Sequence, residues 1–231
     1  GSGVKANILA TLTSKILGTM LHEGAALEDC VETVARTLPV CKVRKTAYAT
    51  FSILQIFHSG EACLVEFDNP SCVFIRDGKI INYPYEIREI GGKKIHEYRF
   101  TVKKNDCFVL MSDGVIYAGA GAILDLQGWT WEAMSEYTLK CTKQTLSASR
   151  LAVMLSDACS ELYEGKPGDD TTVAVARVIE RRIVNIFTGP PAKKEDDERL
   201  MHDFMNAEGK KVVAGGTSAN IAARVLGKEI V

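Results

Sequence analysis

Residues 106–115 read Asp-Cys-Phe-Val-Leu-Met-Ser-Asp-Gly-Val. Apolar side chains follow one another from Cys107 to Met111, without the alternation that is typical of a strand with one face in water. A strand of this kind is covered on both faces, and two packed sheets with helices outside them would provide that cover. The run ends at Asp113, where Gly114 lets the backbone turn sharply.

Short segments rich in aromatic and β-branched residues surround this run, and turn sequences separate them. We predict strands at 48–57, 61–67, 71–76, 79–82, 94–102, 106–111 and 172–179. Asp77-Gly78 between two of these segments favours a hairpin. Apolar residues at helical spacing predict helices at 4–21, 26–38, 130–141 and 145–164. This order of helices, a meander of strands, helices and a closing strand indicates an α+β domain.

The composition is that of a globular protein, with 231 residues of which 46% are hydrophobic and 25% charged. The formal net charge of -1 gives no electrostatic argument for a nucleic acid or an anionic membrane as the main partner. No apolar run approaches the roughly 18 residues that span a bilayer. The seven cysteines form an odd number without a Cys-x-x-Cys pair, which predicts a reducing, cytoplasmic location.

A second acidic segment, Gly168-Asp-Asp-Thr-Thr-Val173, places Asp169 and Asp170 just before the closing strand. If this strand runs antiparallel to the one that ends at Asp113, the carboxylates of Asp113 and Asp169 converge at one sheet edge. Close carboxylates repel each other unless they are protonated or share a cation, and oxygen ligands suit Mg²⁺ or Mn²⁺. Asp-Gly and Asp-Asp are also common turn sequences, so the residues alone leave both a metal site and an ordinary turn open.

Taken in order, these segments resemble the metal-dependent serine/threonine protein phosphatases (the PPM family), and within them the bacterial branch typified by the stage II sporulation protein E phosphatase. Residues 112–114 after an apolar strand and 169–172 at the closing strand carry most of the resemblance. Residues 50–53 and 66–70 follow the order of that branch. Residues 1–6 resemble the tail of the family's first motif, Asp-Gly-x-Gly-x-Gly.

The resemblance implies a four-layer αββα sandwich of two antiparallel sheets flanked by helices over residues 1–180. It implies a two-metal centre of Mn²⁺ or Mg²⁺ and a water that attacks a phosphoserine or phosphothreonine ester of a phosphorylated protein substrate. Asp113 and Asp169 match metal-binding aspartates of the family, and Asp170 matches the neighbouring position, where it orients a ligand or binds weakly. The variable flap that helps to choose substrates falls at Tyr117–Leu126.

The start of the sequence departs from the family pattern. The first motif of the family begins with an Asp-Gly pair whose carboxylate bridges both metals, and Gly1 stands after that pair. We therefore expect this sequence to be a fragment of a longer protein that has the pair. We also expect the polypeptide as it stands to bind the metal pair poorly and to turn over slowly.

Residues 181–231 are predicted to form a linker and a small C-terminal α/β extension, with a helix at 197–208, a strand at 211–214 and a helix at 219–226. Residues 189–198 carry Pro, Gly and mixed charge without an apolar face, which is typical of a linker or of an exposed helix start. The turn Gly215-Gly-Thr-Ser218 is either a plain capped turn or an anion site at a helix start. The extension is expected to dock on the main domain or to bind a regulatory domain or partner protein.

Two functions besides hydrolysis therefore remain open. A non-catalytic regulatory module on the same scaffold would bind a phosphoprotein or a nucleotide without cleaving it. An anion or nucleotide sensor in residues 190–231 is the other candidate. Trp129 and Trp131, which lead into a helix, are expected either to pack in the core or to border a substrate groove.

Overall fold

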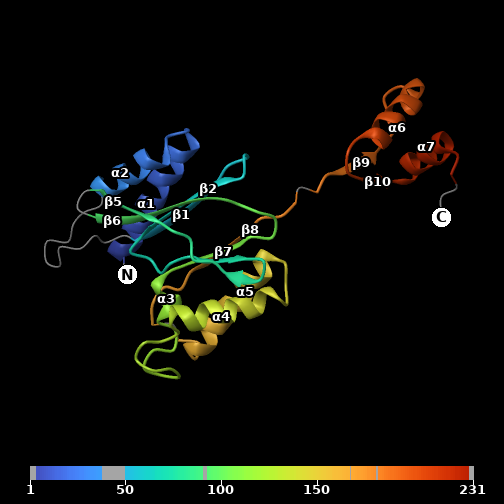
Figure 1. The fold of residues 1–231 in the computed structure, drawn as a ribbon. Coiled ribbons are helices and arrows are strands. Elements are labelled where there is room, and N and C mark those ends of the chain that lie inside the picture. Colours follow the sequence, from blue (N-terminus) through green and yellow to red (C-terminus); the bar gives the residue numbers. More distant parts are fainter. Residues whose placement is uncertain (1–3, 38–49, 91–92, 167, 181, 229–231) are drawn as a thin grey trace. The chain divides into compact units, whose positions relative to one another are not determined.

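Two antiparallel sheets of four strands each lie face to face in the first part of the chain, with helices on both outer sides (Figure 1). The structure is a computed structural model that describes residues 4–37, 50–90, 93–166, 168–180 and 182–228. The chain divides into two compact units, Gly1–Ile179 and Glu180–Val231. The predicted α+β class is confirmed.

The first sheet has the strand order β1-β2-β6-β5, and every neighbouring pair is antiparallel. Its strands are β1 (Phe51–Ile56), β2 (Glu61–Phe67), β5 (Glu86–Ile90) and β6 (Lys93–Thr101). Helices α1 (Val4–His22) and α2 (Leu27–Thr37) pack on its outer face. β5 was not predicted; it lies at the sheet edge and has no buried residue.

The second sheet has the order β4-β3-β7-β8 and is also antiparallel throughout. Its strands are β3 (Val73–Arg76), β4 (Lys79–Ile80), β7 (Cys107–Met111) and β8 (Val173–Arg177). Helices α4 (Trp131–Thr142) and α5 (Ala148–Leu162) cover its outer face. The predicted hairpin joins β3 to β4, where Asp77 and Gly78 both have positive φ angles, of 50° and 70°.

Three clusters of buried side chains separate the four layers, and β7 contributes to two of them. Cys107, Val109 and Met111 face α4 and α5, whereas Phe108 faces the first sheet. Phe108 is fully buried, and its ring centroid lies 4.5 Å from that of Phe74. Both faces of the 106–111 strand are therefore covered, and the predicted αββα sandwich is confirmed.

A buried ion pair ties the two sheets together at the beginning of β7. The Asp106 side chain is fully buried and accepts hydrogen bonds from Arg76 Nε at 2.8 Å, Arg76 Nη2 at 2.6 Å and the Lys103 backbone N–H at 2.7 Å. Arg76 Nη2 also donates to the carbonyl of Thr101, the last residue of β6, at 2.8 Å. Arg76 belongs to the second sheet and Thr101 to the first, so this clamp joins them at the end of the sandwich away from Asp113.

The second unit is a β–α–β–α arrangement. Its elements are β9 (Val184–Thr188), the 3₁₀ turn η1 (Lys194–Asp196), α6 (Asp197–Asn206), β10 (Lys210–Ala214) and α7 (Gly216–Leu226). The two strands run parallel, and a small cluster centred on the fully buried Met201 holds the helices to the sheet. The predicted α/β extension is confirmed, but β9 was not predicted, and α7 begins at Gly216 rather than at Ala219. Within the described part of the chain, no helix is both long and apolar enough to cross a membrane.

Candidate active site

The end of β7 meets the start of β8 at one edge of the second sheet. The two strands are antiparallel, with Met111 opposite Val173, as the sequence analysis required. Beyond this pair, the Ser112 N–H donates to the Thr172 carbonyl at 3.0 Å. The Ser112 hydroxyl donates to the Asp170 carbonyl at 3.0 Å and accepts from the Thr172 N–H at 2.9 Å. Ser112 therefore joins the two acidic segments and does not cap the following helix.

Gly114 allows this close approach. A Cβ atom at this position would lie 2.5 Å from the carbonyl oxygen of Asp170 and 3.0 Å from Thr171 Oγ1. The short helix α3 (Asp113–Ile116) thus starts directly against the segment that precedes β8. On the other side, the Tyr163 hydroxyl at the end of α5 donates to the Gly114 carbonyl at 2.7 Å. Only glycine fits at this position without movement of the neighbouring backbone.

The carboxylates of this edge are accessible to an ion. Asp113 and Asp170 are exposed, and Asp169 is half-buried. Burial raises the pKa of the Tyr163 phenol, and the negative charges of Asp169 and Asp113 act in the same direction. Among the described residues, no group of three or more His, Cys, Asp or Glu could hold a metal ion. Residues 1–3, which carry part of the predicted first motif, lie outside the described residues.

An open cleft of about 980 Å³ lies beside Asp113. Its walls come from the β2–β3 and β4–β5 connections, one face of β6, α3 and the start of α4. Trp131 lines the cleft, whereas Trp129 belongs to the core beneath α4. Of the predicted flap Tyr117–Leu126, Tyr117 is the residue that borders the cleft.

A buried carboxylate fixes the floor of this cleft. The Glu66 side chain on β2 is 3% exposed, and its oxygens accept hydrogen bonds from the Cys72 N–H at 2.6 Å and the Tyr98 hydroxyl at 3.0 Å. Burial raises the pKa of Glu66, while these two hydrogen bonds oppose the shift. Glu66 therefore links β2 to β6 and to the start of β3.

The loop that connects β2 to β3 is held at two further points. Asn69 Nδ2 donates to the Ser52 hydroxyl of β1 at 3.1 Å. The indole N–H of Trp131 donates to the Ser71 carbonyl at 2.7 Å and so joins the loop to α4. Residues 68–72 form one wall of the cleft and are held by side chains from the first sheet and from one helix. The motif at residues 66–70 carries no signal of these contacts in the sequence.

The second unit has a cavity of its own. A space of about 570 Å³ lies where the carboxyl ends of β9 and β10 lead into α6 and α7, and Thr217 of the Gly215–Ser218 turn lines it. Arg224 also lines it and forms an ion pair with the buried Asp197. Carboxyl ends of parallel strands are a common place for ligands. The predicted anion site at this turn stays a prediction.

Comparisons with known proteins agree on the first unit. The sequence model of the family described as Stage II sporulation protein E (SpoIIE) matches residues 1–179. The PP2C phosphatase domain with a fragment of the regulatory domain of SpoIIE from Bacillus subtilis is 19% identical with a TM-score of 0.59, over 77% of this chain and 52% of that one. The SpoIIE phosphatase domain in a crystal form without domain swapping is 18% identical with a TM-score of 0.52, over 78% of both chains.

A third solved structure is similar over more of the chain. The RsbU and RsbW domains of a Mycobacterium tuberculosis protein are 19% identical with a TM-score of 0.58, over 89% of this chain and 56% of that one. At these identities the likeness establishes a shared fold. No curated protein matches the sequence.

Proposed function

Because the chain belongs to the stage II sporulation protein E family, we propose that its first unit hydrolyses phosphoserine or phosphothreonine esters of a protein substrate. The observation that carries this proposal is the β7–β8 edge. There, Ser112 and Gly114 lie against Asp170 and Thr171, so two acidic segments far apart in the sequence are neighbours, which supports a shared site. The cleft beside Asp113 offers space for a peptide at that edge.

Asp113 and Asp169 are the proposed metal ligands. The donor set fits the group, because carboxylate oxygens suit Mn²⁺ and Mg²⁺ and both side chains are reachable from solvent. When bound, the metal pair would acidify the attacking water and offset charge on the phosphoryl oxygens. Ser112 and Gly114 hold the two segments together. Asp170 would orient a ligand, and its own backbone N–H already donates to Asp169 Oδ1 at 2.8 Å.

Two carboxylates form a small ligand set. Since no larger group of candidate ligands occurs among the described residues, we expect this polypeptide to bind Mn²⁺ weakly and to turn over slowly. Binding should therefore be measured directly and up to millimolar Mn²⁺, with hydrolysis of a phosphoserine peptide as the second measurement.

Calorimetric titration with Mn²⁺ tests the assignment. Asp113→Asn and Asp169→Asn should each weaken Mn²⁺ binding at least tenfold, whereas Asp170→Asn should weaken it less. Asp157→Asn, at an exposed position of α5, is the matched control and should bind as the unmodified protein does. If Asp113→Asn and Asp169→Asn bound Mn²⁺ with unchanged affinity, the site would be wrongly assigned.

Hydrolysis separates the two functions that the same scaffold allows. Release of phosphate that depends on Mn²⁺ and is lost in Asp113→Asn supports the enzyme. A phosphoserine peptide that binds but stays intact at saturating Mn²⁺ would instead support the non-catalytic module.

A further inference from the structure

We propose that the cleft beside Asp113 binds the phosphorylated segment of the substrate, and that Lys94 and His96 of β6 select an anionic group in that segment. The inference rests on the phosphatase function proposed above. The anionic group is either the phosphate itself or the carboxylate of a neighbouring acidic residue. These share one chemistry, and the experiment below distinguishes them.

One face of β6 supplies three of the side chains that line the cleft. Lys94, His96 and Tyr98 alternate along the strand, so their side chains point to the same side. Their exposure falls in this order, from the exposed Lys94 through the half-buried His96 to the buried Tyr98. Lys94 is thus at the mouth of the cleft. Tyr98 lies deeper and is held by its hydrogen bond to Glu66.

The imidazole of His96 is held in place by an aromatic neighbour. The Tyr85 ring stacks on it with a centroid distance of 4.4 Å and an interplanar angle of 28°. The same Tyr85 ring lies 5.3 Å from the ring of Tyr98. A side chain packed in this way loses little further freedom when it contacts a ligand, which favours its use in recognition.

The remaining walls suit a peptide. The aromatic side chains of Tyr83, Tyr117 and Trp131 line the cleft together with Tyr85, and residues 68–72 of the β2–β3 loop line it as well. Aromatic surfaces with a few fixed polar groups are typical of ligand clefts, which occupy roughly 300–1,000 Å³. The observed volume of about 980 Å³ leaves room for several residues of a substrate.

The charges along the cleft are unevenly distributed. Its acidic residues are Glu66, Asp68, Asp113 and Glu132. Asp68, Asp113 and Glu132 lie on the β2–β3 loop, α3 and α4, and Asp113 is a proposed metal ligand. Glu66 lies on β2 opposite His96, but its carboxylate accepts hydrogen bonds from Cys72 and Tyr98. Lys94 is the one lysine or arginine among the described lining residues, and no ion pair occupies it within the described part of the chain. Glu89 of β5, also a described residue, lies opposite Lys94 in the sheet but forms no ion pair with it, so the ammonium group of Lys94 is open to a substrate anion.

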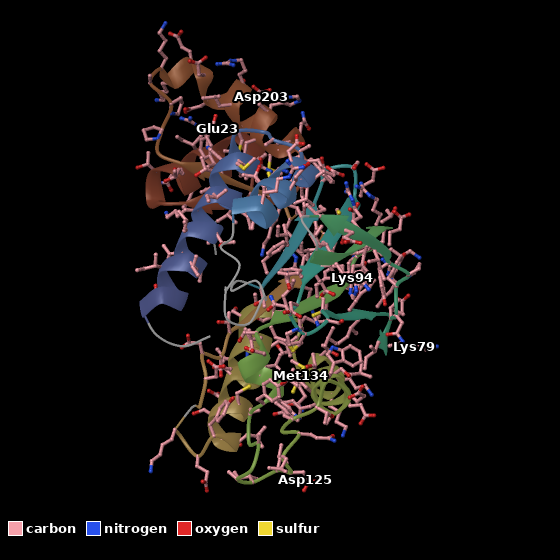
Figure 2. The ribbon with its side chains drawn as sticks, turned by 90° about the vertical axis from the view of Figure 1, so that its left-hand side faces the viewer. Glu23, Lys79, Lys94, Asp125, Met134 and Asp203 are labelled. Carbon is pink, nitrogen blue, oxygen red and sulfur yellow. The ribbon has the colours of Figure 1, made fainter. Side chains whose placement is uncertain are left out.

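The test compares three variants. Lys94→Met removes the charge and keeps the length of the side chain, Lys94→Glu reverses the charge, and His96→Gln keeps a polar side chain. Lys79→Met is the matched control, because Lys79 is an exposed lysine of β4 that does not line the cleft (Figure 2). All four substitutions lie at exposed or half-buried positions, and thermal unfolding checks that the fold is kept.

Fluorescence anisotropy in Mn²⁺ measures the binding of two labelled phosphoserine peptides, one with neutral and one with glutamate neighbours, and their displacement by inorganic phosphate. Lys94→Met should weaken binding about three- to tenfold, and Lys94→Glu more, as expected for the loss of one partly exposed charged contact. His96→Gln should weaken it in the same direction, and Lys79→Met should not change it. An equal loss for both peptides and for inorganic phosphate identifies the phosphate as the anion. A loss confined to the acidic peptide identifies the flanking carboxylate.

The result that would overturn the inference is unchanged affinity of all Lys94 and His96 variants for every ligand, or no binding of either peptide to the unmodified protein at millimolar concentration. Failure of the phosphatase proposal looks different. In that case the peptides bind in a Lys94-dependent manner but are not hydrolysed at saturating Mn²⁺.

Discussion

Gly114→Ala is a direct test of the meeting between β7 and β8. The added Cβ would start 2.5 Å from the Asp170 carbonyl oxygen, whereas ordinary contact begins near 3.4 Å, so this carbonyl must retreat by 3.4 − 2.5 = 0.9 Å. The obstacle is backbone and cannot rotate away. Overpacking of this kind costs about 1–3 kcal/mol of unfolding free energy. The same displacement would stretch the 3.0 Å hydrogen bond from the Ser112 hydroxyl to Asp170, at a further cost of about 1 kcal/mol.

The assay is urea unfolding followed by tryptophan fluorescence. Both tryptophans, Trp129 and Trp131, lie in the first unit, so the signal reports on that unit alone. Gly18→Ala is the matched control: it lies inside α1, and a Cβ there would meet no atom within 4 Å. It should stabilise the protein by about 0.5–1 kcal/mol, since alanine favours a helix over glycine. The two glycine substitutions thus have opposite predicted signs.

Activity gives the second measurement. A displacement of about 1 Å at a reacting site lowers the rate roughly 100-fold, so Gly114→Ala should lose Mn²⁺-dependent hydrolysis even where it remains folded. A Gly114→Ala protein as stable as the unmodified one, with unchanged Mn²⁺ affinity, would refute the close approach of Gly114 to Asp170.

Two further substitutions probe the buried carboxylates. Burial raises the folded-state pKa of Glu66, so its stability contribution is present below the unfolded pKa of about 4.3 and is lost as pH rises through the folded pKa. Glu66→Gln should therefore gain stability relative to the unmodified protein between pH 4 and 8. A pH-independent difference in urea unfolding between the two proteins would contradict this. Asp106→Asn leaves the Arg76 guanidinium without its charged buried partner and should lower the free energy of unfolding by about 3–5 kcal/mol. Glu32→Gln, in the exposed Glu32–Arg36 pair of α2, should lower it by no more than about 0.5 kcal/mol. Equal losses of unfolding free energy would show that the buried pair contributes no more than the exposed pair.

Much of the fold could be predicted because apolar patterning reports burial directly. The unbroken run from Cys107 to Met111 indicated a strand between two layers, and the structure places side chains of this strand in two separate clusters. Strands without such a pattern were missed. β5 and β9 are short, their residues are exposed or half-buried, and neither has an unbroken apolar run like that of β7.

The site could be predicted only where local sequence determines it. Asp-Gly follows one predicted strand and Asp-Asp precedes another. If these strands are antiparallel, the two motifs lie at the same sheet edge, where the structure has the hydrogen bond between Thr172 and Ser112. Single polar contacts over long sequence separations have no periodic signal. The hydrogen bonds from Tyr163 to Gly114 and from Tyr98 to Glu66, and the row of Lys94 and His96, therefore emerged only with the tertiary structure.

The clamp of Arg76, Asp106 and Thr101 ties the two sheets together at one end of the sandwich. From Asp106, β7 runs through five residues to Met111, or about 16 Å at the usual rise of a strand, before it reaches Asp113. A small rotation of one sheet against the other about the clamped end moves atoms most at the far end. Such a rotation would displace Asp113 and the cleft beside it more than the buried residues at the clamped end.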